Sequence, residues 1–277
     1  MEYVELKIAV KDQLQAEILM AELADMPFEA FDGDDNELRA YILAEDYEVC
    51  RDEVAELISL QAEEWSAEKV EQQNWNAEWE SSFDAVEVGG EPALCIRAEH
   101  HTPPAEGVID VIIAPRMSFG TGHHTTTALM SRTIADSDLS GLRGLDMGCG
   151  TGVLAIVAVK CGAQSMVAVD IDQWACDSCL DSIALSGVEQ SIEVRCGSMS
   201  VVEGEKFDFI LANINRNILV DMMPAFAAAL SSGGSLYMSG FLIEDVEVIK
   251  SAAAQYDIIM EQELHRDGWA VVVCKKL

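Results

Sequence analysis

The chain has 277 residues, of which 50% are hydrophobic and 24% are charged, so it can bury a sizeable core without disulfide bonds. It carries 49 acidic and 17 basic residues, which gives a formal net charge of −32. This balance argues against a nucleic-acid-binding surface as the main function, because a phosphate backbone requires lysine and arginine. It is compatible with a basic partner, or with acidic side chains that only keep the protein soluble.

Targeting and metal-binding signals are weak. The first residues, MEYVELKIAV, contain neither a basic nor an apolar signal region, so we expect no signal peptide. The longest apolar stretches, such as 153–159, are far shorter than the roughly 20 residues of a membrane span. Cys176 and Cys179 have CxxC spacing, but no second pair or nearby histidine completes a metal site. We therefore expect a cytoplasmic protein with reduced cysteines, no metal and no membrane partner.

The first 80 residues are the most acidic part of the chain, with 23 acidic and 5 basic residues. This shift in composition predicts a separate domain over residues 1–70. The domain contains no cluster of catalytic side chains, so we interpret it as a substrate-recognition domain. Its hydrophobic pattern predicts the β-α-β-β-α-β order of an α+β ferredoxin-like unit, with strands at 4–10, 28–31, 38–43 and 64–70 and helices from Asp12 and Val49.

A connecting region and a β-rich extension follow this domain. Residues 71–83 contain Trp75, Trp79 and Phe83 at helical spacing, which predicts a linker helix. Residues 84–116 predict a small β-rich extension, with short strands at 85–88, 94–98 and 108–113.

From about residue 125, short apolar strands alternate with helices. This alternation predicts an α/β fold with a doubly wound parallel sheet. The last two strands lie too close together for a crossover helix, so we expect them to form an antiparallel hairpin at the sheet edge. The expected strands are 142–147, 165–171, 192–196, 207–213, 235–240, 256–261 and 269–275.

The segment 141–156, GLRGLDMGCGTGVLAI, carries the clearest chemical signal. A strand ends at Asp146, and glycines 148, 150 and 152 lead into a helix, so the backbone can turn sharply and approach a ligand closely. The GxGxG spacing differs from the GxGxxG of a pyrophosphate-binding site. With an acidic residue directly before the loop, the pattern resembles motif I of class I S-adenosylmethionine (SAM) methyltransferases, which have a Rossmann-like fold.

Two further strand ends are expected at the same edge of the sheet. The second strand ends in VAVDID, with Asp170 18 residues after Gly152, where doubly wound folds place a carboxylate on ribose hydroxyls. Asp172 is the alternative for this role. The fourth strand ends in ILANI, which places Asn213 at the edge. The following NINR lacks the NPPY-like signature of nucleobase amino-methyltransferases, which counts against a base-flipping enzyme.

Residues 117–127 read MSFGTGHHTTT and favour a flexible loop that folds over a cofactor. A metal site at His123 and His124 is less favoured, because adjacent histidines seldom chelate one ion without further ligands. The strings FGTGHHTTT, DMGCGTG, VDID and ANI, in this order, resemble the ribosomal protein L11 methyltransferase family, over essentially the whole chain. The family's loop usually reads FGTGTHPTT, so His123 and Thr125 depart from it.

The resemblance implies SAM-dependent methylation of lysine side chains, the N-terminal α-amine or both, on a basic ribosomal large-subunit protein. It also implies that residues 84–277 are the methyltransferase domain. The cofactor-binding residues that it implies are Thr127, Gly148, Asp170 and Asn213. Their places in the motifs add Asp146, Gly150 and Phe119 to this set.

No residue stands out as a general base for deprotonating the amine. His124 is a candidate by residue type only, and the alternative is that it shapes the loop through hydrogen bonds. Two other functions stay open: a SAM-dependent methyltransferase with another protein, RNA or a small molecule as substrate, and an inactive SAM-binding scaffold. The absence of a basic patch counts against RNA, and the intact loops count against the scaffold.

Overall fold

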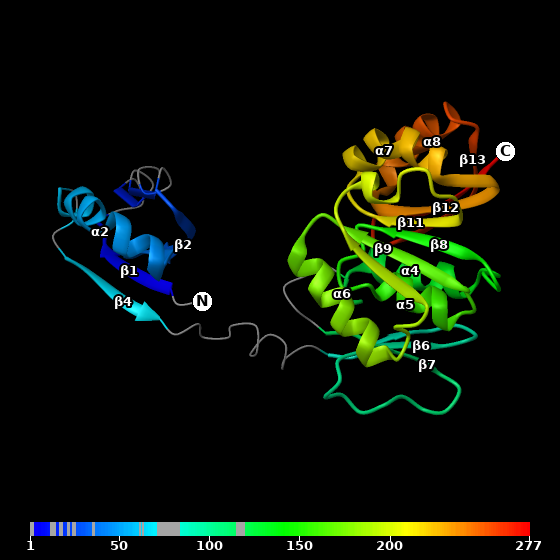
Figure 1. Cartoon of the computed structure of the whole chain (residues 1–277), viewed down its shortest axis with the longest axis horizontal. Helices are drawn as coiled ribbons and strands as arrows, with labels where there is room; N and C mark the ends of the chain where they lie inside the picture. Colours follow the sequence, from blue (N-terminus) through cyan, green and yellow to red (C-terminus); the bar gives the residue numbers. More distant parts are fainter. Residues whose placement is uncertain are drawn as a thin grey trace. The chain divides into compact units, whose positions relative to one another are not determined.

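The computed structural model of this chain describes residues 3–11, 15–16, 19–20, 23, 26–34, 37–60, 62, 64–70, 84–114 and 120–277. The chain divides into two compact units, Met1–Ala77 and Glu78–Leu277, and each is described by itself. Figure 1 shows their elements. The helix expected over 71–83 lies outside the described residues. Among the described residues, no helix is long and apolar enough to cross a membrane.

The first unit is built on a four-stranded antiparallel sheet of order β2-β3-β1-β4. Alternate residues of β1 and β3 are buried against helix α2, whose Val54 and Ile58 complete the core. Half of the segment between β1 and β2 lies outside the described residues, so the complete ferredoxin-like unit stays a prediction. The elements are β1 (Tyr3–Ala9), β2 (Phe28–Asp34), β3 (Glu37–Leu43), α2 (Ala44–Ser59) and β4 (Trp65–Val70).

Helix α2 begins at Ala44, five residues before the position expected from the sequence. The expected start at Val49 was wrong because Val49 is 88% exposed, whereas Tyr47 is buried in the core. The apolar face of the helix therefore starts one turn earlier than the aliphatic pattern indicated.

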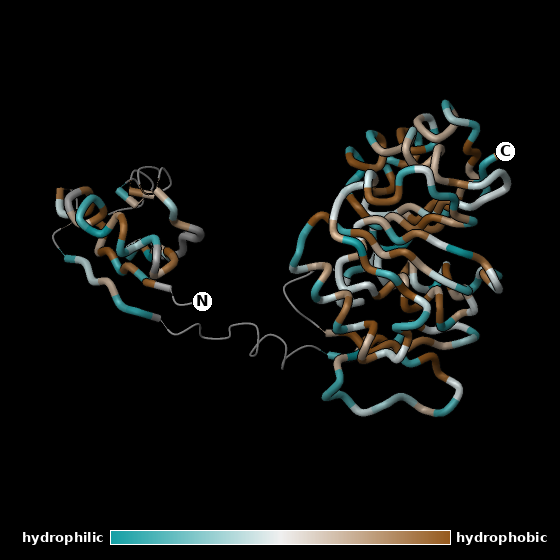
Figure 2. The backbone as a smooth tube through the Cα atoms, viewed as in Figure 1, coloured by the Kyte–Doolittle hydropathy of each residue, from teal (hydrophilic) through white to brown (hydrophobic). Residues whose placement is uncertain are grey.

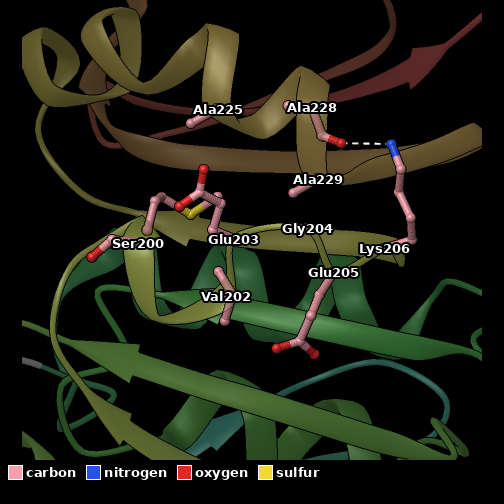
Figure 3. Close-up of a pocket in the computed structure, with 10 residues that line it drawn as sticks. Ser200, Val202, Glu203, Gly204, Glu205, Lys206, Ala225, Ala228 and Ala229 are labelled. Carbon is pink, nitrogen blue, oxygen red and sulfur yellow. Dashed lines mark hydrogen bonds between the residues drawn. The ribbon is translucent and has the colours of Figure 1, made fainter.

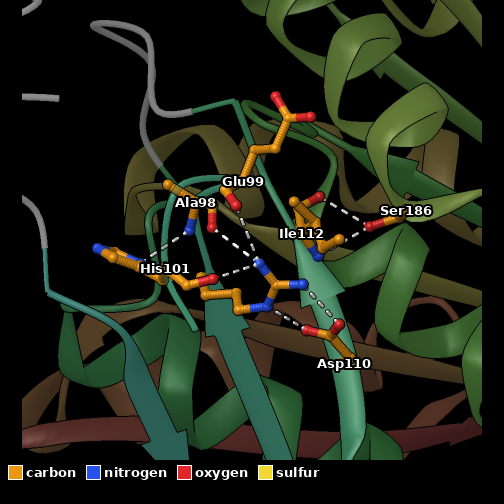
Figure 4. Close-up of polar contacts among 7 residues, drawn as sticks. Ala98, Glu99, His101, Asp110, Ile112 and Ser186 are labelled. Carbon is orange, nitrogen blue, oxygen red and sulfur yellow. Dashed lines mark hydrogen bonds and ion pairs between the residues drawn. The ribbon is translucent and has the colours of Figure 1, made fainter. Parts of the chain in front are cut away.

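The second unit opens with a small sheet of β5 (Val86–Val88), β6 (Leu94–Arg97) and β7 (Ile109–Ile112), which lie close to the three short strands expected there. Arg97 is buried and joins β6 to β7 through bonds of 2.8 and 2.9 Å to the carboxylate of Asp110. Its Nη1 also donates to the carbonyl oxygens of Ala98, Glu99 and His101 (Figure 4). This network joins β6, the turn that follows it and β7.

A seven-stranded sheet of order β10-β9-β8-β11-β12-β14-β13 forms the centre of the second unit. The first five strands are parallel, and β14 is antiparallel to both β12 and β13. The α/β class and the antiparallel hairpin at the edge are confirmed. The strands are β8 (Arg143–Met147), β9 (Ser165–Asp170), β10 (Ile192–Cys196), β11 (Phe207–Asn213), β12 (Leu230–Leu242), β13 (Ile258–Arg266) and β14 (Trp269–Lys276).

Helices cover both faces of this sheet, and each face has its own apolar core. Phe209 and Leu211 of β11 belong to the core that includes α4, α5 and α6, whereas Ile210 and Ala212 belong to the core that includes α7 and α8. Strands β9 and β11 are therefore largely apolar, and Figure 2 shows hydrophobic, brown segments through the middle of this unit. The helices are α4 (Thr125–Ala135), α5 (Val153–Lys160), α6 (Gln173–Ser186), α7 (Arg216–Ala229) and α8 (Val246–Ala254).

The strand order reverses between β8 and β11, since β9 and β10 lie on one side and β12 on the other. In open α/β sheets, ligands bind outside the carboxyl ends of the strands at such a switch point. The loops after β8, β9 and β11 are therefore the place to look for a site.

Candidate functional site

The loop after β8 turns on three glycines with left-handed backbone conformations, because Gly148, Gly150 and Gly152 have φ of 76°, 52° and 77°. The N–H of Gly148 donates to the carbonyl of Val169 at 2.8 Å, so the loop is tied to the end of β9. A Cβ on Gly148 would lie 2.4 Å from Cγ2 of Ile214. The loop between β8 and α5 thus requires glycine for both its turn and its packing.

Asp146 lies behind this loop and acts on the start of α5. Its Oδ2 accepts a hydrogen bond from the N–H of Ala155 at 3.1 Å, while its Oδ1 has no partner among the described residues. The side chain is 1% exposed. Burial raises the pKa of Asp146 to about 7, the Ala155 hydrogen bond lowers it, and the nearby Asp170 raises it further. Asp146 therefore positions the helix and the loop.

Asp170, at the tip of β9, holds the glycine loop and faces the cleft. Its Oδ2 accepts from the N–H of Gly150 at 3.0 Å, and its Oδ1 accepts from the N–H of Asp172 at 3.1 Å. Each carboxylate oxygen has a second lone pair that can accept from a ligand. Asp172 caps α6 instead, by accepting from the N–H of Trp174 at 2.9 Å. Asp170 therefore holds the glycine loop and Asp172 holds the start of α6, while both border the cleft.

Asn213, at the end of β11, carries an unpartnered acceptor. Its Nδ2 donates to Oγ1 of Thr127 at 3.5 Å, and its buried Oδ1 has no partner among the described residues. A buried carbonyl without a partner costs about 1–3 kcal/mol, which a donor on a ligand can offset. Thr127 is almost fully buried on α4 and contacts this amide. The geometry gives Thr127 a role in orienting Asn213.

His124 caps the N-terminus of α4. Its Nδ1 accepts from the N–H of Thr126 at 3.3 Å and lies 2.8 Å from Oγ1 of the same residue. The edge of its ring packs on Trp269, with ring centroids 4.7 Å apart. These contacts support the interpretation that His124 shapes the loop.

These side chains meet at one cleft of about 730 Å³ at the carboxyl edge of the sheet. A volume in this range suits a small molecule or cofactor. Of the expected residues, Gly148, Gly150, Asp170 and Asn213 line it, whereas Asp146 and Thr127 are not among its described lining residues and Phe119 lies outside the described residues. The cleft is also lined by His124, Thr126, Met147, Ile171, Asp172, Ala175, Ser198, Met199, Ile214, Asn215, Ile218, Asp221, Met222, Ala225, Gly240 and Trp269.

Thr126 and Trp269 are lining residues that the sequence analysis missed. Thr126 stood in the quoted loop motif, beside the Thr127 that the resemblance implied. Trp269 follows the tight turn of the β13–β14 hairpin, and β14 pairs with β12, which brings the tryptophan to the cleft from the end of the chain. An aromatic residue directly after the RDG turn was the only local signal.

A second hollow of about 570 Å³ begins where the cleft ends, since Met199 and Ala225 line both. In Figure 3, Lys206 on its far side reaches the carbonyl oxygen of Ala228, at 2.6 Å, and so neutralises the C-terminal end of α7. Glu205 is already paired with Arg143 and Arg195. Lys206 and Glu205 are thus engaged in structural contacts, and Glu203 and Ser200 are the other polar side chains that line the hollow.

Comparison with known proteins shows the family. A family model described as ribosomal protein L11 methyltransferase (PrmA) matches residues 6–277. The chain belongs to this family. A ribosomal protein L11 methyltransferase of Porphyromonas gingivalis is 40% identical over 265 residues, covering 92% of this chain and 89% of the relative. One of Bacteroides fragilis is 36% identical over 260 residues, covering 92% of each.

A solved structure of a ribosomal protein L11 methylase from Lactobacillus delbrueckii subsp. bulgaricus has the same fold, with a TM-score of 0.64 and 26% identity. It matches 70% of this chain and 100% of its own chain. This chain is therefore a methyltransferase of the L11 methyltransferase family, as the loop motifs indicated. The family's expected Thr and Pro are replaced here by His123, which is exposed, and Thr125, which begins α4.

Proposed function

We propose that this protein transfers methyl groups from SAM to amino groups of ribosomal protein L11, on lysine side chains, the N-terminal α-amine or both. The observation that carries this proposal is the cleft, where the Asp170 carboxylate and the unpartnered Oδ1 of Asn213 border one glycine loop. The names of the relatives support the substrate.

The residues present fit SAM. The second lone pairs of the Asp170 oxygens can accept from the two ribose hydroxyls, and the bare backbone at Gly148 and Gly150 allows close approach. Asn213 offers its buried Oδ1 to a donor on the cofactor, and Thr127 orients it. When bound, SAM supplies an electrophilic methyl group on its sulfonium. Asp146 acts through the loop and helix that it holds.

The amine has to lose a proton before it can attack. For lysine at pH 7 this costs about 4.6 kcal/mol, given a pKa near 10.4. Desolvation in a closed cleft lowers the pKa of the amine and so reduces this cost. His124 already uses Nδ1 to cap α4, which disfavours it as a base. We therefore assign catalysis to alignment and desolvation, without a dedicated base.

The acidic first unit is the proposed recognition domain. Residues 1–77 hold 21 acidic and 5 basic side chains, and a basic ribosomal protein is attracted to such a surface. The same charge disfavours direct nucleic-acid binding. We place the reaction in the cytoplasm, where ribosomal proteins are made, and include no membrane partner or metal.

The test is transfer of a labelled methyl group from SAM to purified ribosomal proteins, followed by mass mapping of the products. We expect label on L11 and not on RNA or on unrelated ribosomal proteins. Label on a different protein or on a small molecule would support methyl transfer from SAM but would show that L11 is not the substrate. Binding of SAM without transfer to any acceptor would leave the inactive scaffold as the function.

A further inference from the structure

Two loops that the sequence analysis treated as separate motifs are joined by one side chain. Oγ1 of Thr151, in the glycine loop, donates to the carbonyl oxygen of Gly120 at 2.7 Å. Thr151 is fully buried, and Gly120 is buried with φ of +108°. A Cβ on Gly120 would lie 2.7 Å from this same Oγ1. The contact thus depends on a hydroxyl in one loop and on the lack of a side chain in the other.

The loop held at Gly120 continues into one wall of the cleft. Gly122 packs against Ile96 of β6, where a Cβ would lie 3.2 Å from Cδ1. His124 then caps α4, and both His124 and Thr126 line the cleft. Thr151 is not among the described residues that line it. Its influence on the cleft therefore passes through the backbone of Gly120.

We propose that Thr151 is a positioning residue for the cleft, whose hydroxyl fixes Gly120 and thereby the loop that carries His124 and Thr126. A ligand that orders the glycine loop then also orders this wall. Because such coupling is reciprocal, a change that loosens this wall also lowers the affinity of the cleft for the ligand. The identity of the ligand as SAM rests on the proposed function, whereas the coupling itself rests on the geometry.

Thr133 provides a matched control. It is buried in α4, and its Oγ1 donates to the carbonyl of Leu129 at 2.8 Å. Replacing either threonine by valine nearly keeps the volume and removes one side-chain hydrogen bond to a backbone carbonyl. The Thr133 bond lies within one helix, whereas the Thr151 bond connects two loops. A purely structural role predicts equal effects of the two variants on the cleft.

The first measurement uses the full chain without SAM. The amide N–H groups of Thr127 and Ala128 both donate to the carbonyl of His124, at 3.0 and 3.2 Å, so their hydrogen exchange reports on this wall. We expect Thr151→Val to accelerate their exchange at least tenfold, and Thr151→Ser and Thr133→Val to stay within threefold of wild type. Equal exchange in the two valine variants would overturn the proposal.

The second measurement is the Kd for SAM by calorimetry. We expect Thr151→Val to raise it at least tenfold, Thr151→Ser to restore it and Thr151→Cys, a weaker donor, to lie between them. If the valine variant does not fold, the Kd values of Thr151→Ser and Thr151→Cys are compared instead. A higher Kd for Thr151→Cys supports the proposal, and equal Kd values for these two variants would overturn it. If wild type does not bind SAM, the proposed function fails, while the exchange measurement still decides the role of Thr151.

Discussion

The carboxylate of Asp170 accepts a hydrogen bond from the backbone N–H of Gly150 at 3.0 Å, so the tip of β9 and the loop after β8 hold each other in place. The two residues are 20 positions apart in the sequence, so the glycine-loop motif and the VDID motif together form one site. The same carboxylate also accepts from the N–H of Asp172. A ligand bound to Asp170 therefore stabilises a loop geometry that already exists.

We expect Asp170→Ala to weaken SAM binding by about 1.5–3 kcal/mol, the range for hydrogen bonds to a charged group. The variant loses both the ligand contact and the tie to Gly150. Asp172→Ala is the matched control, since it removes the cap of α6 and costs about 1 kcal/mol of stability. Calorimetry on both variants checks this, and a larger loss of affinity for Asp172→Ala would reverse the assignment.

Gly148→Ala is expected to lower both stability and SAM affinity. The added Cβ would lie 2.4 Å from Cγ2 of Ile214, and alanine would have to adopt the left-handed φ of 76° found at this position. We expect a loss of about 1–3 kcal/mol of unfolding free energy. Adding Ile214→Ala relieves the contact, so part of the stability should return. Urea unfolding measures the first effect, and recovery of normal affinity in the double variant would contradict the close-approach role of Gly148.

Stability should depend on pH through Asp146. Burial raises its folded-state pKa to about 7 from the ordinary 3.8. Between these values the unfolded chain releases the proton while the folded protein keeps it, so stability falls as the pH rises and the loss approaches about 4 kcal/mol near pH 8. Asp146→Asn keeps an oxygen for the N–H of Ala155 and cannot ionise. We therefore expect the variant to gain stability relative to wild type from pH 5 to pH 8.

Unfolding curves for both proteins at the two pH values test this expectation. Asp138 supplies a control whose contribution should stay constant from pH 5 to pH 8, because hydrogen bonds from the side chain and backbone of Ser140 lower its pKa from the ordinary 3.8. Its contribution to stability is present above the unfolded-state pKa and disappears as the pH falls. A pH-independent difference between wild type and Asp146→Asn would show that Asp146 ionises normally in the folded protein.

The parallel strands were predictable because burial on both faces leaves a nearly continuous apolar run, and β10 and β11 match the expected bounds. The positions of Gly148 and Gly150 were also predictable, since the turn needs a left-handed backbone. The position of Trp269 at the cleft was not predictable, because it depends on the pairing of β14 with β12. Likewise β12 runs from Leu230 to Leu242, longer than expected from its own apolar segment.

His124→Asn separates the two roles considered for this residue. Asparagine is a good N-cap, so α4 should still begin at the same residue and the free energy of unfolding should not change. If His124 only shapes the loop, kcat/KM stays within about tenfold of wild type, whereas loss of a general base costs about 100-fold or more. The measurement is the pH profile of methyl transfer for both proteins. A loss of that size, together with a changed profile, would restore the base assignment.

The last prediction concerns the acidic first unit. Glu48, Asp52 and Glu53 are exposed on α2, and we expect their combined change to Gln, Asn and Gln to reduce kcat/KM for intact L11 at low salt. The physical reason is the loss of attraction to a basic substrate, which acts mainly on association. The SAM affinity should not change, because every described cofactor residue lies in the second unit. A control variant neutralises three exposed acidic residues of the second unit, namely Glu189, Glu244 and Glu261.

Salt distinguishes this effect from a general one. Raising the ionic strength to 0.15 M shortens the Debye length to about 8 Å, so the difference between wild type and the α2 variant should shrink as salt is added. Because the control removes the same charge, any effect of net charge alone appears equally in both variants. A larger loss for the α2 variant at equal SAM occupancy assigns substrate docking to the first unit. Equal kcat/KM values for the two variants would show that its acidic residues serve only solubility.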